Sequence, residues 1–375
     1  MGTPRKLNIG ILTSSRADYG IYLPLLNMLR EQGRHSVRII AFGTHLSKKH
    51  GHTIDEISRD GFEVAHQIET TPEGDTAEEI TRSMGITMEK FSALWAKHRE
   101  DFDILFCLGD RYEMFAAVAS TATFNLKLAH LHGGETTLGA IDNAFRHSIT
   151  QFCQFHFTST EKYAQRVKGL LDDPSHIYTV GALGLDHFND QKMLTSEELK
   201  LRFNIEVNDR TILCTFHPET ISPEKNVHYA QEIISAFHQL KNHNVVITLP
   251  NADTSGNTIR RMFSEAFNTS TNIALVENLG SSGYLSAMNA CGMMFGNSSS
   301  GIIEAASLGK YVIDIGDRQK GRAHGDNVIH CEIEKEKMLA EIESIASRPK
   351  LSGNNIYYRG GAADKIIERI ESALC

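Results

Sequence analysis

The positions of hydrophobic residues in the first half of the chain predict strands that alternate with helices. The mostly apolar run 7–13 predicts a buried strand. Leucines at 23, 25, 26 and 29 recur on one face of a helix, and 77–101 has the pattern of a long amphipathic helix. Further strands are expected at 37–42, 104–108, 126–131, 155–158 and 177–180, and a further helix at 114–124.

The second half repeats this scheme with strands of four to six residues. These strands are expected at 211–216, 245–249, 273–276, 292–295 and 311–315, with helices between them such as 229–240 and 283–289. Short apolar strands separated by helices are typical of parallel sheets that helices cover on both faces. The pattern therefore predicts an α/β protein with two Rossmann-like domains, whose parallel sheets face a central cleft.

The boundary between the two domains is expected where glycines cluster between a strand and a helix, at 181–190. This places an N-terminal domain at 1–185 and a C-terminal domain at 186–361. The last helical stretch, 362–375, follows the break at Gly360 and Gly361, and we expect it to join the N-terminal domain.

Composition narrows the classes of partner. The chain has 375 residues and a net charge of −8, so it has no general positive field for nucleic acid or an anionic membrane surface. No apolar run approaches the ~20 residues that span a bilayer, and the first residues lack the apolar core of a signal peptide. The six cysteines form no CxxC pair, which is typical of a reducing compartment. We therefore expect a cytoplasmic protein.

Polar residues follow almost every predicted strand. In open parallel sheets, ligands bind beyond the carboxyl ends of the strands. A single polar segment after a strand is weak support for a binding site, because turns favour the same residues. Seven such segments on two domains indicate a binding site. These endings are 14–20, 109–111, 132–135, 217–220, 250–253, 296–301 and 316–322.

Three serines at a predicted helix start favour a phosphate site. Ser298, Ser299 and Ser300 precede a helical pattern at 302–308, where backbone N–H groups and hydroxyls can hold a diphosphate. The alternative is a plain N-terminal cap. Glu304, expected one turn inside that helix, could accept hydrogen bonds from ribose hydroxyls or could be an ordinary acid of the first turn.

Arginines would supply the positive charge that a phosphate ligand needs. Arg16, Arg318 and Arg322 follow predicted strands, and their forked guanidinium groups match phosphate oxygens. The alternative for each is an ion pair on the surface.

Four further residues are candidates for acid/base chemistry. Asp110, Glu135 and Asp142 offer carboxylates, and His217 lies in a stiff turn before Pro218, where it could donate to a departing phosphate. Each has a structural alternative. Asp110 could be a turn residue and Glu135 a solvated loop acid, while Asp142 could be a helix cap and His217 a hydrogen-bonded loop histidine.

Several motifs of other sites are missing from the sequence. There is no GxGxxG after the first strand, no GxxxxGK[ST] loop and no HExxH. His130, His132 and Glu135 have no evident fourth partner for a metal. The Asp-Phe-Asp triplet at 101–103 precedes a strand, at the wrong end for a site. We therefore expect neither a cofactor nor a metal.

The motifs taken together resemble a known family. They closely resemble the hydrolysing UDP-N-acetylglucosamine 2-epimerases of bacterial sialic acid biosynthesis, in the same order over roughly residues 6–328. The matching segments are 15–20 (SRADYG), 109–111 (GDR), 132–135 (HGGE), 146–150 (RHSIT), 216–220 (FHPET), 251–253 (Asn-Ala-Asp), 296–301 (GNSSSG) and 315–322 (IGDRQKGR).

The resemblance implies a fold, a reaction and a set of binding residues. The family has the two-domain GT-B fold and releases N-acetylmannosamine and UDP without a metal or a nicotinamide. We expect the chain to form a homodimer or a homotetramer. The resemblance implies that Asp110, Glu135 and Asp142 surround the sugar and that His217 faces the leaving phosphate. It implies substrate or UDP contacts for Arg16, Asp18, Arg111, His147, Asn251, Ser298, Ser299, Ser300, Glu304, Arg318 and Arg322.

One departure from related sequences favours the hydrolysing branch. The non-hydrolysing epimerases carry Arg-Pro-Glu and a lysine after the first strand, whereas this loop reads Arg16-Ala17-Asp18 with no lysine. Such an enzyme eliminates UDP in the anti sense to give 2-acetamidoglucal, and then hydrates it. The C2 proton becomes acidic only as UDP leaves, so phosphate-binding groups serve the first step. Acid/base groups are then needed on both faces of C2.

Three alternatives remain at this stage. The first is the same reaction on UDP-N,N′-diacetylbacillosamine, in legionaminic acid synthesis. The second is a GT-B glycosyltransferase, which would need an acceptor pocket rather than a cluster of carboxylates. The third is a catalytically inactive nucleotide-sugar sensor, against which the intact Asp110, Glu135 and His217 argue.

Overall fold

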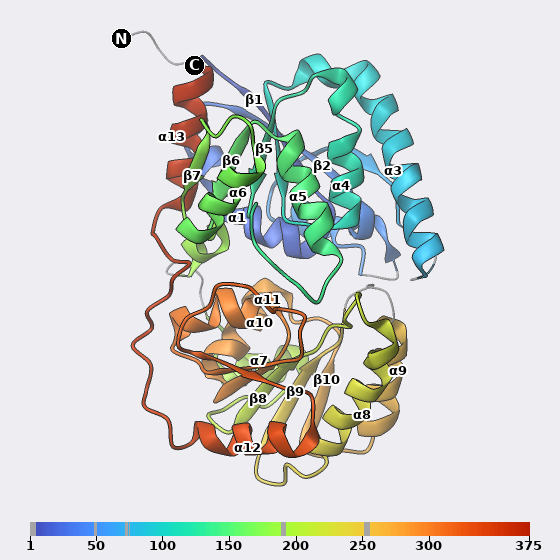
Figure 1. Cartoon of the computed structure of the whole chain (residues 1–375), viewed down its shortest axis with the longest axis vertical. Helices are drawn as coiled ribbons and strands as arrows, with labels where there is room; N and C mark the ends of the chain where they lie inside the picture. The colour runs from blue at the N-terminus through green and yellow to red at the C-terminus, as the bar shows by residue number, and fades with distance from the viewer. Residues whose placement is uncertain (1–4, 49–50, 72–73, 75, 189–192, 251–255) are drawn as a thin grey trace. The chain divides into compact units, whose positions relative to one another are not determined.

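A computed structural model describes residues 5–48, 51–71, 74, 76–188, 193–250 and 256–375 (Figure 1). The contacts divide the chain into two compact units. The first comprises 1–135, 142–190 and 357–375, and the second comprises 136–141 and 191–356.

The first unit is built on a parallel sheet, which has seven strands within the described residues, in the order β3-β2-β1-β4-β5-β6-β7. The strands are β1 (Asn8–Thr13), β2 (Ser36–Phe42), β3 (Val64–Ile68), β4 (Ile104–Leu108), β5 (Leu128–Leu131), β6 (Phe155–Thr158) and β7 (Ile177–Thr179). The helices are α1 (Arg16–Gln32), α2 (Ile54–Arg59), α3 (Ala77–His98), α4 (Tyr112–Ala119), α5 (Asp142–Phe152), α6 (Glu161–Leu170) and α13 (Ala362–Leu374).

Two apolar clusters cover the faces of this sheet. On one face, leucines of α1 pack with Ile366, Ile367 and Ile370 of α13, so the last helix contributes to the core of the first unit. On the other face, Phe91 and Trp95 of α3 pack with residues of α4 and α5. Burying an isoleucine side chain contributes about 1.5–3 kcal/mol, so the three residues of α13 hold the end of the chain firmly in place.

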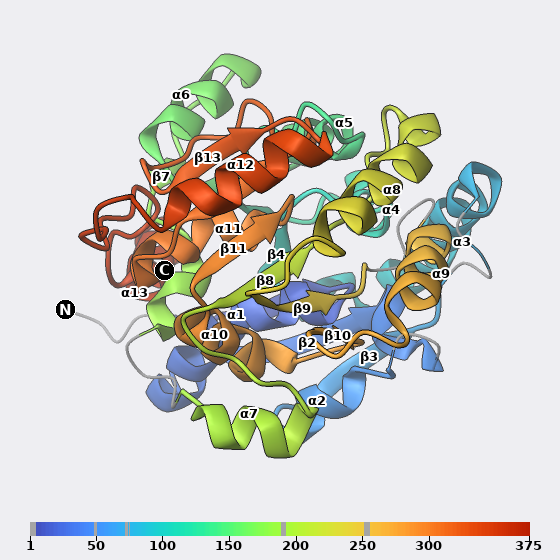
Figure 2. The ribbon, with the colours of Figure 1, turned by 90° about the horizontal axis from the view of Figure 1, so that it is seen from below.

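The second unit has a parallel sheet of six strands within its described part, in the order β10-β9-β8-β11-β12-β13. The strands are β8 (Thr211–Thr215), β9 (Asn244–Thr248), β10 (Ile273–Val276), β11 (Met293–Gly296), β12 (Val312–Ile315) and β13 (Val328–Cys331). The helices are α7 (Ser196–Phe203), α8 (Asn226–Phe237), α9 (Gly256–Phe267), α10 (Gly280–Ala290), α11 (Ser299–Ile303) and α12 (Lys335–Ile345). Figure 2 shows α8, α9 and α12 on one side of this sheet and α7 and α10 on the other.

Every strand predicted from the apolar runs is present, with boundaries that differ by up to two residues. Two strands were not predicted. β3 and β13 lie at edges of their sheets and are largely half-exposed, so their sequences lack a continuous apolar run.

Two predicted helices are shorter than expected. The helix expected at 77–101 ends at His98, and the helix expected at 114–124 is α4, which ends at Ala119. Ser120 and Thr121 donate their hydroxyl protons to the carbonyls of Ala117 and Val118, at 2.6 and 2.7 Å. Such bonds from side chain to backbone compete with the helical pattern and favour its end.

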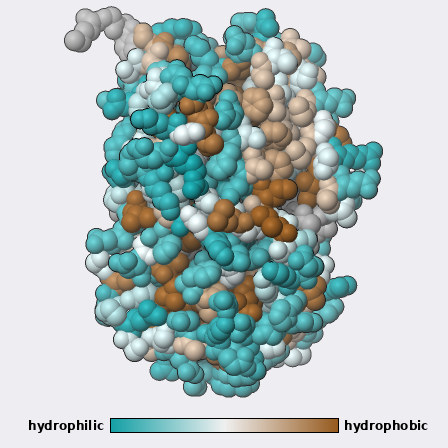
Figure 3. All heavy atoms as spheres, in the orientation of Figure 1, coloured by the Kyte–Doolittle hydropathy of each residue, from teal (hydrophilic) through white to brown (hydrophobic). Residues whose placement is uncertain are grey.

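Most side chains on the face shown in Figure 3 are hydrophilic. Among the helices in the described ranges, none combines the length and the apolar character needed to cross a bilayer.

Candidate functional site

Polar residues follow four neighbouring strands of the first sheet, β1, β4, β5 and β6. Because the strands are parallel, these residues lie together at the carboxyl-terminal end of the sheet, as the sequence predicts for a binding site. They comprise 14–18 after β1, 109–111 after β4, 132–135 after β5 and Ser159 after β6.

Among the carboxylates in these segments, Glu135 is the most buried, with 1% of its surface exposed. Its Oε1 atom accepts hydrogen bonds from His132 Nδ1 and Ser159 Oγ, both at 2.8 Å. The chain bends sharply here, since His132 and Gly134 have φ of 62° and 76°. A Cβ atom on Gly134 would lie 2.5 Å from the carbonyl oxygen of Tyr163, so this position requires glycine.

His132 adds a second group that can carry a proton. Its Nδ1 atom donates to a carboxylate, so its Nε2 atom is the nitrogen left to accept or release a proton. This atom is buried and has no hydrogen-bond partner in the described part of the chain. A carboxylate that orients an imidazole in this way is suited to general acid/base chemistry.

Arg146 of α5 joins two of the loops. Its side chain is 2% exposed and donates to the carbonyl oxygen of Glu135 at 2.8 Å and to Asn143 Oδ1 at 3.1 Å. It also forms an ion pair with Asp110, which follows β4. The structure thus brings the predicted Asp110 and Glu135 to the same guanidinium group, and Asp142 begins the helix that carries it.

Two histidines support or border this network. His130 Nε2 donates to the carbonyl of Gly109 at 2.9 Å, and its Nδ1 lies 3.1 Å from Thr150 Oγ1. Burial lowers the pKa of His130 to about 3, so it is neutral and supports the loop before Asp110. Burial also lowers the pKa of the half-buried His147, and the charges of Arg146 and Arg166 add to this effect.

The remaining predicted residues of the first unit differ in availability. Arg16 at the start of α1 has a buried Nη1 atom with no hydrogen-bond partner among the described residues, and burial lowers the pKa of its guanidinium. A buried guanidinium nitrogen without a partner is suited to bind an anion.

Asp18 and Arg111 have structural contacts instead. Asp18 stabilises its own loop, because Oδ2 accepts from the backbone N–H and hydroxyl of Ser14 at 3.0 and 2.6 Å. Arg111 points its Nε and Nη2 atoms at buried Glu113, so that edge of its guanidinium has a structural role.

Asn297 is the centre of the network in the second unit. It follows β11 and is fully buried. Its Oδ1 atom accepts from the backbone N–H of His217 at 2.7 Å, and its Nδ2 atom donates to the His217 carbonyl at 2.8 Å. Its own carbonyl accepts from Arg318 and Gln319 at 3.2 and 2.8 Å. Asn297 thus contacts the predicted His217 through its side chain and the predicted Arg318 through its backbone carbonyl, directly before the predicted serines.

The serine segment forms a chain of hydroxyl groups. Ser298 caps α11 by accepting from the Ser300 backbone N–H, and the two hydroxyl oxygens lie 2.9 Å apart. Ser300 Oγ lies 2.7 Å from the hydroxyl of Tyr284, which lies 3.2 Å from Thr215 Oγ1. Burial raises the pKa of Tyr284 to about 12, so it stays protonated and donates. Ser298 is thus a helix cap, the alternative considered from the sequence, and its segment also presents hydroxyls.

The expectation of one helix from the serines to Leu308 was wrong. α11 ends at Ile303, and a 3-10 turn follows at Ala305–Leu308. Ser307 N–H bonds the carbonyl of Glu304, three residues back, which tightens the turn. Glu304 is therefore the C-cap of α11 rather than a residue one turn inside a longer helix.

A second set of contacts holds the loop 316–322, which follows β12 and carries Arg318 and Arg322. Glu219 is 3% exposed, and its Oε1 atom accepts from the backbone N–H of Asp317 at 2.7 Å. Burial raises the pKa of this carboxyl. Gly316 has φ of 73°, and a Cβ atom there would lie 2.7 Å from Glu219 Oε1. Arg322 at the end of this loop is 7% exposed.

The short segment 136–141, between Glu135 and Asp142, belongs to the second unit by its contacts. Leu138 N–H donates to the carbonyl of Lys320 at 3.0 Å, and Ile141 N–H donates to Thr220 Oγ1 at 2.9 Å. The segment therefore rests against the loop that carries Arg318 and Arg322.

Some outcomes could not be read from the sequence. Asn251 lies outside the described residues. Arg146, Asn297 and Ser159 were not predicted as site side chains, and His132 was considered only as a metal ligand. No group of three or more histidine, cysteine or acidic side chains suited to a metal ion occurs in the ranges that the structure describes.

Comparison with known proteins gives a family, and the relatives of the chain include two bacterial proteins at more than 30% identity. The profile of the UDP-N-acetylglucosamine 2-epimerase family matches residues 27–371. Polysialic acid biosynthesis protein P7 of Escherichia coli is 34% identical over 358 residues, which are 94% of this chain and 90% of that protein. The hydrolysing GDP/UDP-N,N′-diacetylbacillosamine 2-epimerase of Campylobacter jejuni is 32% identical over 88% of this chain and 85% of its own.

The fold is also similar to a solved structure. The UDP-GlcNAc 2-epimerase from Neisseria meningitidis, bound to UDP-GlcNAc, matches with a TM-score of 0.81 at 15% identity, over 97% of this chain and 99% of that one. This likeness confirms the predicted GT-B-like α/β fold with its two parallel sheets.

Proposed function

The chain belongs to the UDP-N-acetylglucosamine 2-epimerase family, and we propose that it is a hydrolysing member, which converts UDP-N-acetylglucosamine and water into UDP and N-acetylmannosamine for sialic acid biosynthesis. The buried Glu135, held by His132 and Ser159, is the observation that carries this proposal. Inversion at C2 requires a group that removes a proton from carbon, and this carboxylate–imidazole pair can do so. The loop Arg16-Ala17-Asp18 and the Campylobacter jejuni relative, which its name describes as hydrolysing, support the hydrolysing branch.

The first step of the proposed reaction breaks the bond between C1 and the UDP oxygen. UDP leaves with the bonding electrons, and C1 becomes electron-poor, which acidifies the proton on C2. Arg318, Arg322, the Ser298–Ser300 hydroxyls and His217 stabilise the negative charge on UDP. Asn297 positions this set because it fixes the backbone of His217 and contacts Arg318. Arg16 adds a further cation, and Glu304 binds the ribose hydroxyls.

In the second step a base of the first unit removes the C2 proton, and the C1–C2 double bond of 2-acetamidoglucal forms. Glu135 and His132 are the base and its proton relay in this proposal, with Asp110 and Asp142 as the acid/base groups of the opposite face. Water then adds its oxygen to C1 while a proton returns to the other face of C2. The net change is hydrolysis of the sugar–phosphate bond and inversion at C2.

The proposal is tested by incubating the purified protein with UDP-N-acetylglucosamine alone and identifying the sugar released. We expect free N-acetylmannosamine and UDP in equal amounts. Release of N-acetylglucosamine would indicate simple hydrolysis, and interconversion of UDP-sugars without release would indicate a non-hydrolysing epimerase.

A second candidate substrate is UDP-N,N′-diacetylbacillosamine. The relative from Campylobacter jejuni, at 32% identity, acts on this sugar according to its name. The two substrates differ at C4 and C6 and undergo the same chemistry at C1 and C2. A comparison of kcat/KM for the two UDP-sugars distinguishes them.

A further inference from the structure

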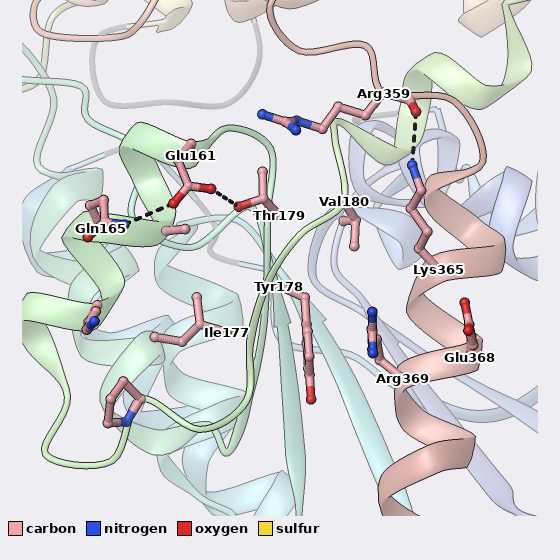
Figure 4. Close-up of a pocket in the computed structure, with 13 residues that line it drawn as sticks. Glu161, Gln165, Ile177, Tyr178, Thr179, Val180, Arg359, Lys365, Glu368 and Arg369 are labelled. Carbon is pink, nitrogen blue, oxygen red and sulfur yellow. Dashed lines mark hydrogen bonds between the residues drawn. The ribbon is translucent and has the colours of Figure 1, made fainter.

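The first unit contains a pocket of about 740 Å³ that takes no part in the proposed reaction. It is lined by β7 and by residues of α6 and α13 (Figure 4). β7 is the last strand in the order of its sheet, so the pocket lies along the sheet edge. The proposed acid/base residues follow β4 and β5 instead.

The charge of this pocket is opposite to that of the whole chain. Lys168, Arg359, Lys365 and Arg369 line it together with two acidic residues, Glu161 and Glu368, whereas the chain has a net charge of −8. Lys365 is occupied, because its Nζ atom donates to the carbonyls of Arg359 and Gly360 at 2.9 and 2.7 Å.

The other three cations remain available to a ligand. In the part of the chain that the structure describes, no ion pair joins Lys168, Arg359 or Arg369 to a carboxylate within salt-bridge distance. The guanidinium of Arg369 lies 5.3 Å from the centre of the Tyr178 ring, which fixes its direction. Cations that are gathered in a pocket and form no salt bridge favour an anion.

Hydrogen-bonding groups for hydroxyls lie beside these cations. Glu161 accepts from Gln165 and from the Thr179 hydroxyl at 3.0 Å, and its pKa is lowered by these two bonds and by the charge of Arg359. Figure 4 shows Arg359 extending from one wall toward the pair formed by Glu161 and Thr179. Carboxylate, amide and hydroxyl groups together can both donate to and accept from the hydroxyls of a sugar.

From these features we propose that the pocket binds a small hydroxylated anion, of the chemical class of sugar phosphates and sugar acids. In this proposal Arg359 and Lys168 hold the oxyanion, and Glu161, Gln165 and Thr179 hold the hydroxyls. Arg369, which Figure 4 shows on another wall beside Tyr178, adds positive charge to the pocket. The volume suits a monosaccharide, since ligand pockets typically have about 300–1,000 Å³. The site is separate from the catalytic residues, so the proposal does not depend on the proposed reaction.

Binding would also hold together two distant segments of the first unit. Arg359 follows Tyr357, whose carbonyl accepts from the Ala182 backbone N–H at 2.9 Å, next to the end of β7. Lys168 belongs to α6. A ligand that contacts both residues links 357–359 to α6, so we expect it to raise the melting temperature of the protein.

The test is calorimetric titration of the full chain, with saturating UDP present, using glucose 6-phosphate, glucuronate, inorganic phosphate and glucose as separate probes. We expect glucose 6-phosphate or glucuronate to bind, inorganic phosphate to bind more weakly, and glucose not to bind. The tighter of the first two identifies a phosphate or a carboxylate as the preferred anion. Binding of glucose as tight as that of the charged sugars would overturn the proposal.

Variants localise the binding to this pocket. Arg359→Glu and Lys168→Glu, both exposed side chains, should each weaken the charged sugar by about tenfold or more, because each removes a charge-assisted contact and adds a repulsive one. Arg82→Glu, at an exposed position of α3, makes the same charge change elsewhere and should leave binding unaltered. Absence of binding by either charged sugar, or equal binding by Arg359→Glu and the wild type, would refute the site. These outcomes are independent of whether the enzyme epimerises UDP-sugars.

Discussion

The Nδ1 atom of His132 lies 2.8 Å from the Oε1 atom of Glu135, and both side chains are buried at the carboxyl end of β5. The bond fixes the imidazole with its Nε2 atom directed away from the carboxylate. The carboxylate thereby orients the ring so that Nε2 is the atom that faces a proton donor or acceptor. The pair is thus the group of the first unit best suited to move a proton to or from a sugar carbon.

Glu135→Gln should block removal of the C2 proton and leave UDP affinity nearly unchanged. The amide keeps the shape of the side chain and loses its basicity, so we expect kcat to fall by about 100-fold or more. Exchange of the C2 proton with solvent and calorimetric titration with UDP measure the two effects. Glu89→Gln, at an exposed acid on α3, is the matched control and should retain activity. A large loss of UDP affinity in Glu135→Gln would contradict the assigned role.

His217→Ala should slow the departure of UDP rather than proton transfer. Removing one donor that stabilises developing charge typically costs on the order of 100-fold in rate. Added 2-acetamidoglucal bypasses that step, so the variant should hydrate the glucal much better, relative to wild type, than it turns over the UDP-sugar. Glu135→Gln should be poor with both substrates. Equal losses on both substrates for His217→Ala would show that its role is not confined to the leaving group.

Bulky replacements in the serine segment should weaken UDP binding before they alter the chemistry. Ser300 lies in a chain of hydroxyls with Ser298 and Tyr284, and Ser299 lies between the two serines in sequence. Ser299→Leu and Ser300→Leu each replace a hydroxyl of this segment with a bulky side chain. We expect UDP affinity to fall by about tenfold or more in calorimetric titrations. Ser281→Leu on the exposed side of α10 is the control. Unchanged UDP affinity in the first two variants would exclude this segment as the diphosphate site.

Asn297→Ala should lower both the stability of the protein and its affinity for UDP. The backbone N–H and carbonyl of His217 would lose their partners, at a cost of about 1–3 kcal/mol each. Asn272→Ala also removes two hydrogen bonds, to the carbonyls of Leu240 and His243, and should lower stability alone. Urea unfolding and UDP titration separate the two effects, and a normal UDP affinity in Asn297→Ala would show that the contact is structural only.

Stability should fall as the pH falls below about 6.5, because three histidines of the first unit are buried in the neutral form. Burial lowers the pKa from 6.5 to about 4 for His45 and His156 and to about 3 for His130. These histidines bind protons near pH 6.5 in the unfolded chain but stay neutral at that pH in the folded chain. Lowering the pH therefore favours unfolding. Each histidine contributes at most about 1.4 kcal/mol per pH unit.

Urea unfolding of His156→Leu between pH 4.5 and 8.5 checks this dependence. The variant should show a shallower loss of stability below pH 6.5 than the wild type. The two slopes should agree above pH 7.5, where the histidines are neutral in both states, and this range serves as the internal control. Identical slopes at low pH would show that His156 is protonated in the folded protein.

The sequence predicted strand ends better than it predicted side-chain networks. Glu135 could be predicted because a strand, two glycines and an acid follow one another along the chain. Arg146 gave no such signal, since its reach to Asp110 and to the Glu135 carbonyl depends on how α5 packs. Asn297 looked like a turn residue, and only the pairing of β8 with β11 places it against His217. Glu304 was misplaced because hydrophobic periodicity cannot distinguish an α-helix from an α-helix followed by a 3-10 turn.

The most direct test of the proposed reaction is NMR of the sugar that the purified protein releases from UDP-N-acetylglucosamine in D2O. Elimination followed by hydration passes the C2 proton through groups that exchange with solvent. The account therefore predicts free N-acetylmannosamine that carries deuterium at C2, together with an equal amount of UDP. N-Acetylmannosamine that keeps the original hydrogen at C2, or the release of N-acetylglucosamine, would contradict it.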